Sequence, residues 1–189
     1  MNKGLRLATG EVIGFLNADD LYAHREVLAA VASTFRGQTG LQTCFGDLTY
    51  VDILDTRKVV RYWRSCAFQP GIFQKGWVPP HPTFYAKRTA YLEHGGFNLS
   101  YSLAADFELM LRFLEARHLS TAYIPQVLVR MRMGGATNRS ISNIIQQNRE
   151  IVRAFRENDL PTPNLLAYFG TKIFHRLGQY LSGYRKEPV

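Results

Sequence analysis

The chain has 189 residues, of which 46% are hydrophobic and 20% are charged. This length and composition fit one folded domain, and they exclude a disordered chain, a coiled coil and a disulfide-rich scaffold. The net charge is +8, and residues 121–189 carry ten basic against four acidic side chains. The excess suits a phosphate-bearing partner (a nucleotide, a nucleic acid, a lipid diphosphate or an anionic membrane face), and it fits a solvated basic surface equally well.

The sequence shows no sign of a secretory signal or of a membrane-spanning helix. The apolar run at residues 27–32 is far shorter than the ~20 residues that a membrane-spanning helix needs. Arg6, Thr9 and Glu11 interrupt any apolar region of a secretory signal. The two cysteines, Cys44 and Cys66, form no CxxC motif. We therefore expect a cytoplasmic protein in which both cysteines are reduced and buried.

The first third of the chain alternates helical and extended patterns. Residues 2–8 predict a short amphipathic helix closed by Gly10. Residues 11–16 predict a buried strand that stops at polar residues 17–20. A helix is expected over residues 25–35, followed by a strand, a turn and a second strand within residues 41–63.

The rest of the chain continues with extended and helical segments. We expect a stiff extended segment at 79–82, a strand at 83–86, helices at 87–94 and 106–119, a strand at 122–133, a loop at 134–138, and helices at 140–157 and 164–181. Strands and helices alternate early and an interrupted mixed sheet follows, so the predicted fold class is α/β, a mixed sheet with flanking helices and further helices at the C-terminus.

Two adjacent carboxylates, Asp19 and Asp20, follow the first predicted strand. Open α/β sheets bind ligands beyond the carboxyl ends of their strands. Carboxylate oxygens are ligands for Mg²⁺ or Mn²⁺, and such a metal can bridge to a diphosphate. The alternative is an Asp-rich turn whose side chains cap the following helix.

A second acidic pair, Asp106 and Glu108, opens the helix expected at 106–119. A carboxylate there can act as a general base on a substrate hydroxyl, or it can simply cap the helix. His81 stands between two prolines on a rigid segment, where it can contact an acceptor, carry a proton or serve a structural role.

Arg130 and Arg132 alternate on the strand that leads into Gly134-Gly135. Guanidinium groups match phosphate oxygens bidentately, so this pair is a candidate for binding a diphosphate. The pair fits two solvent-facing side chains on an edge strand equally well.

The order of these segments resembles glycosyltransferase family 2. The segments that carry the resemblance are Met1-Asn2-Lys3-Gly4 with Ala8-Thr9-Gly10-Glu11, Leu16 to Tyr22, His81-Pro82-Thr83-Phe84, and Gly96-Phe97-Asn98 with Ala105 to Arg112. They cover roughly residues 1–140 in the family's order, and the combination is more specific than any one segment.

The resemblance implies a GT-A fold and transfer from a nucleotide-diphospho-sugar, assisted by Mg²⁺ or Mn²⁺, with inversion at the anomeric carbon. Carried over by position, Asp20 is the metal ligand and Asp19 lies beside it on the donor. Arg130 and Arg132 are taken as further donor-binding residues. Asp106 is the catalytic base, while His81 and Glu108 are assigned to the acceptor, a glycan or a lipid-linked sugar of surface polysaccharide synthesis.

The chain departs from the family pattern at its start, because Met1 coincides with a position that normally follows an opening strand and helix. We therefore expect an N-terminally incomplete GT-A catalytic domain over residues 1–140 with an exposed sheet edge, and a C-terminal helical extension over residues 141–189. Two other interpretations stay open: a noncatalytic fragment or partner subunit with the same fold, and a basic nucleic-acid-binding domain.

A basic amphipathic pattern over residues 164–185 predicts peripheral contact with the inner face of a membrane. The same apolar stripe could instead pack on the core of the domain or cover a partner.

Overall fold

The computed structural model describes residues 1–133, 141–165, 168, 170 and 171. Within these residues six strands form one mixed sheet with the order β1-β5-β3-β6-β2, and β4 pairs with β3 beside this path. The strands are β1 (Val12–Gly14), β2 (Leu21–Tyr22), β3 (Thr43–Val51), β4 (Val59–Trp63), β5 (Tyr85–Lys87) and β6 (Thr121–Arg132). The predicted α/β class with a mixed sheet and flanking helices is confirmed.

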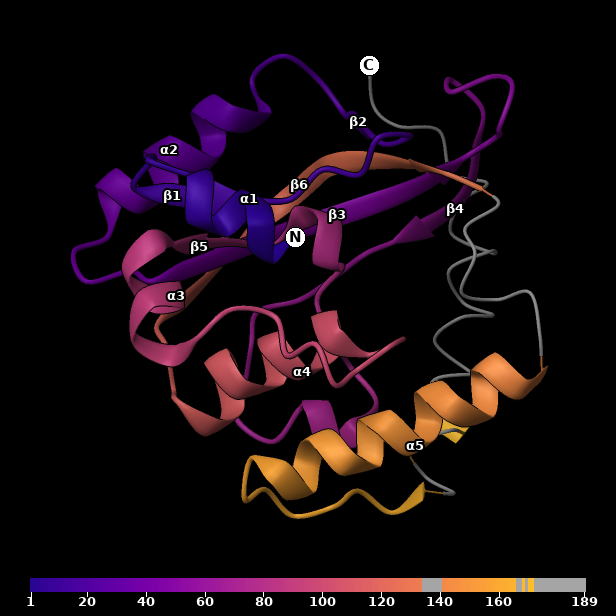
Figure 1. Ribbon diagram of the computed structural model, residues 1–189. Coiled ribbons are helices and arrows are strands. Elements are labelled where there is room, and N and C mark those ends of the chain that lie inside the picture. The colour runs from indigo at the N-terminus through magenta and orange to yellow at the C-terminus, as the bar shows by residue number, and fades with distance from the viewer. Residues whose placement is uncertain (134–140, 166–167, 169, 172–189) are drawn as a thin grey trace.

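Helices cover both faces of this sheet. They are α1 (Asn2–Leu7), α2 (Val27–Gly37), α3 (Arg88–His94), α4 (Ala105–Leu111) and α5 (Ile141–Glu157), with short 3₁₀ turns η1 (Phe73–Lys75) and η2 (His81–Thr83) and a π-helical turn η3 (Arg112–Ala116). Figure 1 shows α2 on one side of the sheet and α4 with α5 on the other. None of the helices within the described residues is long and apolar enough to cross a membrane.

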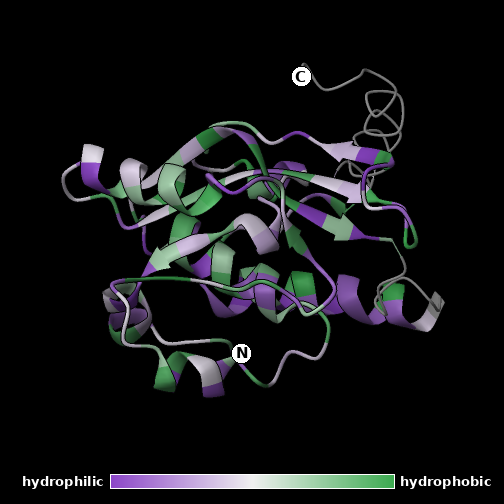
Figure 2. Ribbon diagram, turned by 90° about the horizontal axis from the view of Figure 1, so that it is seen from above, coloured by the Kyte–Doolittle hydropathy of each residue, from purple (hydrophilic) through white to green (hydrophobic). Residues whose placement is uncertain are grey.

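β3 and β6 are the two longest strands and form the centre of the sheet. They run parallel, from the pair Thr43–Thr121 to the pair Val51–Arg132. Apolar side chains of both strands are fully buried, among them Phe45, Leu48 and Leu128. Figure 2 shows the hydrophobic residues gathered in the sheet and in the helices against it, while α5 is mostly hydrophilic.

Two packed apolar clusters correspond to the two faces of the sheet. The smaller cluster lies under α2 and contains Val27, Val31 and Leu48. The larger one joins the other face to α3, α4 and α5. Ile151, Ala154 and Phe155 of α5 belong to this larger cluster, so α5 is packed on the same core as the sheet. The predicted domain boundary at residue 140 lies outside the described residues, as do the predicted loop at 134–138 and most of the helix predicted at 164–181.

Three local predictions are wrong. The segment 11–16 is not a buried strand but an edge strand paired only with β5 within the described sheet, and only Ile13 in it is buried. The segment at 79–82 does not stay extended, because His81 begins the 3₁₀ turn η2. Cys44 is buried as expected, but Cys66 is exposed.

Helix α4 also differs from the prediction of one continuous helix at 106–119. The α-helical part ends at Leu111 and the chain continues as the π-helical turn η3 to Ala116. A π-turn inserts an extra residue and shifts the side chains that follow it. Here the shift lets Glu115 accept hydrogen bonds from the backbone N–H groups of Gly71 and Phe73, which holds the loop before η1.

Candidate functional site

Three segments that are distant in sequence meet in one aromatic cluster. Phe15 follows β1 directly, and its ring stacks on that of His81 with centroids 6.3 Å apart. Phe97 meets both rings edge to face, at 5.2 Å from Phe15 and 5.7 Å from His81. Such pairs favour one relative orientation of the rings. The cluster therefore joins two of the segments that carry the family resemblance, those of His81 and Phe97, to Phe15, which directly precedes a third.

His81 is held in place by the turn that it opens. The hydroxyl of Thr83, which is fully buried, donates to the carbonyl of Gly46 at 2.9 Å and to that of Pro80 at 2.8 Å. Gly46 belongs to β3, and a Cβ at this position would lie 2.6 Å from the side chain of Leu128. The glycine thus allows close packing of β3 on β6, while Thr83 fastens the histidine-bearing turn to the centre of the sheet.

Phe97 is held by Asn2, which lies near the N-terminus in α1. The amide of Asn2 donates to the carbonyl of Phe97 at 2.7 Å and accepts from its backbone N–H at 2.9 Å. Asn2, Phe15 and Phe97 are not among the predicted site residues, although all three lie in or beside the segments that carry the resemblance. The structure joins Asn2 to Phe97 by two hydrogen bonds and packs Phe97 against Phe15.

Asp106 lies on the second residue of α4, and its charge acts on His81. Burial lowers the pKa of His81 below its usual value, and the carboxylate of Asp106 partly offsets that effect. His81 is therefore mostly neutral near pH 7. The turn η2, which begins with His81, packs against α4, which carries Asp106. The carboxylate of Asp106 accepts a hydrogen bond from the backbone N–H of Phe107 at 2.7 Å, which limits its rotation.

The start of α4 is capped from outside the helix. Ala104 at its N-cap offers no capping side chain, and instead Glu150 of α5 accepts hydrogen bonds from three successive backbone N–H groups. The distances are 3.1 Å from Ser102, 2.8 Å from Leu103 and 2.9 Å from Ala104. Glu150 is only 7% exposed. It thereby fixes the loop that delivers Asp106 to the site.

Asp20 forms a second acidic position, just before β2. It is 4% exposed, and its Oδ2 accepts from the amide of Asn17 at 2.8 Å, while its Oδ1 has no hydrogen-bond partner. Burial raises the pKa of Asp20 and the charge of Asp19 raises it further, against the lowering effect of Asn17 and of the Arg132 backbone. Asp19 itself is exposed. Asp20 lies five positions after Phe15, so the chain places it within about 18 Å of the aromatic cluster.

The unpartnered oxygen of Asp20 allows a test of the predicted metal. The described residues contain no group of three or more His, Cys, Asp or Glu side chains that could hold an ion. Mg²⁺ is, however, commonly bound through one or two carboxylates with substrate phosphates and water completing its shell. Asp20 with Asp19 fits this second kind of site and does not fit an all-protein metal cage.

The two predicted arginines stand on the strand beside Asp20. Arg130 of β6 pairs with Leu21 of β2 in the register of the sheet, and Arg132 follows two residues later, so both lie on the same side of β6. Both side chains are partly buried. β2 pairs with β6 at Val129 and Arg130, so this part of β6 is not a free edge. The two arginines are therefore basic groups next to the acidic position of Asp20.

Glu108 has a structural environment. It is 3% exposed, forms an ion pair with Arg112 at 2.8 Å, and accepts from Asn158 at 3.3 Å. Arg112 in turn donates to the carbonyls of His94, Gly95 and Gly96, directly before Phe97. These contacts do not support the expected contact of Glu108 with the acceptor. Glu108 instead orients Arg112, and Arg112 holds the segment that leads to Phe97.

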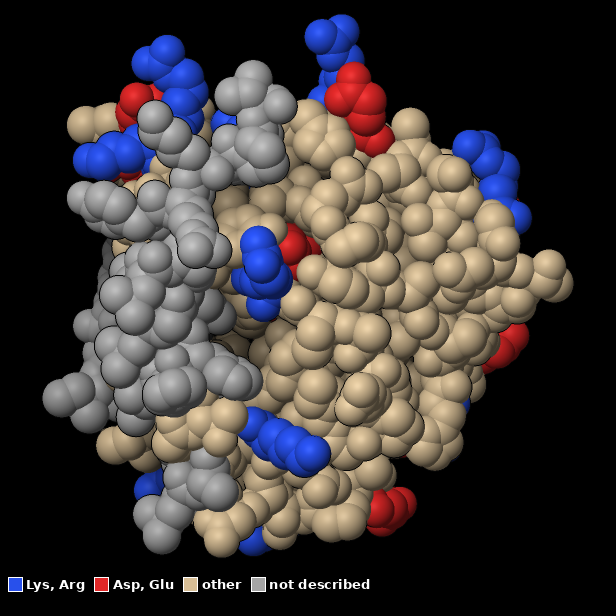
Figure 3. Space-filling model, turned by 180° about the vertical axis from the view of Figure 1, so that it is seen from behind, with Lys and Arg blue, Asp and Glu red and all other residues tan. Residues whose placement is uncertain are grey.

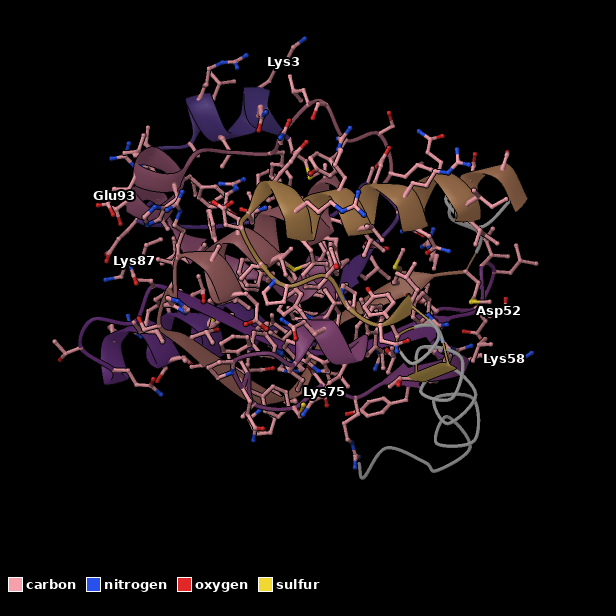
Figure 4. The ribbon with its side chains drawn as sticks, turned by 90° about the horizontal axis from the view of Figure 1, so that it is seen from below. Lys3, Asp52, Lys58, Lys75, Lys87 and Glu93 are labelled. Carbon is pink, nitrogen blue, oxygen red and sulfur yellow. The ribbon has the colours of Figure 1, made fainter. Side chains whose placement is uncertain are left out.

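Several of the charged residues labelled in Figure 4 lie away from the candidate site. Lys3, Lys58 and Glu93 lie at the edges of the molecule and point outwards. Lys58 pairs with Asp52 in the turn between β3 and β4, at 3.9 Å. The candidate site is therefore the region defined by Phe15, His81, Phe97 and Asp106, with Asp20 at the end of the segment that follows Phe15.

Comparison with known proteins shows a likeness to glycosyltransferases. Curated proteins described as "PGL/p-HBAD biosynthesis glycosyltransferase" from Mycobacterium bovis (strain BCG / Pasteur 1173P2) and Mycobacterium tuberculosis (strain ATCC 25177 / H37Ra) are each 29% identical to this chain over 139 residues. The match covers 73% of this chain and 52% of each relative, so the chain spans about half the length of the curated relatives it matches. No family model matches the chain. The likeness supports a glycosyltransferase, while family 2, the GT-A fold and an incomplete N-terminus stay predictions.

The Glu150 contacts predict a pH-dependent loss of stability in Glu150→Gln. Burial alone would raise the pKa of Glu150, but the N–H groups of Leu103 and Ser102 lower it below its usual value. The ionised form therefore stabilises the fold above the unfolded-state pKa of the carboxyl, and this contribution is lost as the pH falls through the folded-state pKa.

We expect Glu150→Gln to lower the free energy of unfolding by about 1–3 kcal/mol at pH 7, because hydrogen bonds to a charged acceptor are replaced by weaker ones. The difference from wild type should shrink as the pH falls towards 3. Urea unfolding at several pH values measures it, with the exposed Glu93→Gln as the control. A difference that stays constant with pH would contradict the role of the charge.

Proposed function

We propose that this chain is the catalytic part of a glycosyltransferase that moves a sugar from a nucleotide-diphospho-sugar to a glycan or lipid-linked acceptor with inversion. The observation that carries the proposal is the packing of η2, which bears His81, against α4, which bears Asp106, with Phe15 stacked on the His81 ring. The likeness to named glycosyltransferases supports the same activity. Their name also favours an acceptor that is built into a cell-surface glycolipid.

Asp106 is the proposed base. In an inverting transfer the acceptor oxygen attacks the anomeric carbon, the bond from that carbon to the diphosphate breaks, and the acceptor hydroxyl loses its proton. The Asp106 carboxylate accepts this proton. Burial keeps the His81 ring mostly neutral. A neutral imidazole can hold the acceptor by a hydrogen bond, whereas a protonated ring would bind the donor's phosphates instead.

Asp20 and its neighbours are proposed to hold the donor. A divalent cation bound there would neutralise the charge that develops on the leaving diphosphate. Asp19 and Asp20 would supply carboxylate oxygens to the cation, and Arg130 and Arg132 would hold phosphate oxygens from the adjacent strand. The aromatic wall of Phe15 and Phe97 would keep water from the reacting carbon.

The alternative of a nucleic-acid-binding domain finds no support on the face that Figure 3 shows. Figure 3 shows that, among the described residues on the face opposite to that of Figure 1, basic side chains are scattered singly over a mostly uncharged surface. Binding to a nucleic-acid backbone would call for a continuous basic stripe. A noncatalytic protein with the same fold remains the main competing hypothesis, and the following two experiments separate it from an enzyme.

Asp20→Asn should abolish metal-dependent binding of the donor without destabilising the fold. Burial already disfavours the charged carboxylate of Asp20, so a neutral amide should leave the melting temperature at pH 7.5 unchanged or raise it. Calorimetric titration of Mn²⁺ with UDP, GDP or dTDP measures the binding. Equal heats for both proteins, or no heat for wild type with any of the nucleotides, would contradict the assignment.

Asp106→Asn should abolish sugar transfer while nucleotide binding survives, because the base acts on the acceptor hydroxyl and not on the diphosphate. Asparagine keeps an oxygen for the Phe107 N–H, so the fold should be retained. The measurement is transfer from a panel of nucleotide-sugars in the presence of a lipid-linked acceptor fraction.

Glu108→Gln serves as the comparison, since Glu108 is the neighbouring carboxylate. It should lower stability through the pairing with Arg112 and leave the transfer rate of the folded protein largely unchanged. An Asp106→Asn rate within about threefold of wild type, a difference below ~1 kcal/mol in the activation free energy, would remove Asp106 as the base.

A further inference from the structure

We propose that the outer face of α5 docks on an anionic lipid membrane. A groove of about 460 Å³ runs along this face and continues to Leu165. Its lining combines three arginines, Arg149, Arg153 and Arg156, with the apolar side chains Ile145, Val152 and Leu165. Of the segment 164–185, in which the sequence pattern predicts membrane contact, only Leu165 lines this groove, and the surface is separate from the aromatic cluster around His81.

The charges of the groove are of one sign. None of the described residues that line it is a carboxylate. Arg149 and Arg156 are exposed and take part in none of the ion pairs found among the described residues. Arg153 is bound to Ser100, lies over the ring of Tyr101 and pairs with Glu157, so it is held in the wall of the groove. Two free guanidinium groups, seven residues apart, thus face the same side of the helix.

Apolar side chains lie between these charges. Ile145 is 49% exposed and Leu165 is 45% exposed. Exposed branched apolar residues beside arginines are the pattern of a helix that lies in a membrane interface, where the aliphatic groups enter the acyl boundary and the guanidinium groups meet phosphates. Exposure of these apolar side chains to water is unfavourable. An anionic lipid surface would take up the apolar side chains and pair with the arginines.

The inner face of α5 is already occupied. Ile151, Ala154 and Phe155 are buried in the larger core cluster, and Glu150 holds the loop before α4. The helix is therefore firmly seated, and the groove is a rigid surface of the domain. Arg149 is adjacent to Glu150, so a membrane on the outer face would lie about one helix diameter, some 10 Å, from the loop that leads to Asp106.

Other occupants fit the groove less well. A second copy of the chain in a two-fold dimer would bring the same arginines against each other, which costs free energy. A single-stranded nucleic acid would call for aromatic rings on which bases stack, and the part of the lining that the structure describes contains none. An anionic membrane meets both the charge and the apolar surface. Membrane docking does not depend on the proposed function. If the protein is a glycosyltransferase with a lipid-linked acceptor, the same membrane would also present that acceptor, and this addition does rest on the proposed function.

Co-sedimentation of the full chain with lipid vesicles tests the proposal independently of transfer. Phosphatidylcholine vesicles are compared with vesicles that also contain phosphatidylglycerol, at low and at high salt. We expect binding to the anionic vesicles only, weakened by salt. Arg149→Glu/Arg156→Glu should reduce the affinity at least tenfold, since each arginine near an anionic surface contributes a factor of about five.

The control Arg25→Glu/Arg57→Glu changes the net charge equally at side chains that are 93% and 88% exposed elsewhere. It should retain most of the binding. Ile145→Asn should also weaken binding, while Leu54→Asn, at a leucine 93% exposed in the turn between β3 and β4, should not.

Three results would overturn the proposal: no preference of wild type for anionic vesicles, equal losses in both double variants, or binding that is unaffected by Ile145→Asn. Sedimentation velocity of the same variants separates a dimer interface. A wild-type dimer that Ile145→Asn dissociates, with vesicle binding unchanged, would assign the groove to a second copy. Loss of transfer with intact vesicle binding would instead count against the proposed function alone.

Discussion

The parallel pairing of β3 with β6 is the constraint on which the rest of the structure depends. Parallel neighbours need a crossover, so the chain between Val51 and Thr121 must leave the sheet and return to it. β5 takes the other edge of β3 during this excursion, and α4 packs below the sheet (Figure 1). His81 and Asp106 both belong to the crossover, and they meet because it folds back on the same face. At the register shift of β3, Asp47 accepts hydrogen bonds from Tyr62 and Tyr123, which joins β3 to both neighbours.

Buried carboxylates in this protein divide into two kinds. Glu115, Glu150 and Asp47 each accept several hydrogen bonds, and these bonds offset the loss of water around the charge. Asp20 is equally buried but keeps one oxygen without a partner, and its pKa is raised by burial. The environment of Asp20 therefore disfavours its own charge. Sites that lower stability in this way are expected where a ligand completes the environment, which agrees with a cation and a phosphate at Asp20.

Much of the fold could be predicted from periodicity and turn residues, but long-range contacts could not. The two central strands and α2, α3 and α5 lie where apolar spacing placed them, because those patterns are local. The depth of burial at 11–16 was misjudged, since an apolar run does not show whether a strand is central or at an edge. In the candidate site, motif order singled out His81, Asp106 and Asp20, whose roles stay predictions. The capping of α4 by Glu150 and the hold of Asn2 on Phe97 join residues 46 and 95 positions apart, and no local pattern signals either contact.

The central claim is that His81 and Asp106 act on each other in one site, and the titration of His81 tests it most directly. Proton NMR of the imidazole signals gives the pKa of His81 in wild type and in Asp106→Asn. Burial should place the wild-type pKa below about 6.5, the usual value for histidine. Removal of the Asp106 charge should lower it further, because that charge favours the protonated ring. A pKa that is unchanged or higher in Asp106→Asn would show that the two groups do not interact, and would contradict the site described above.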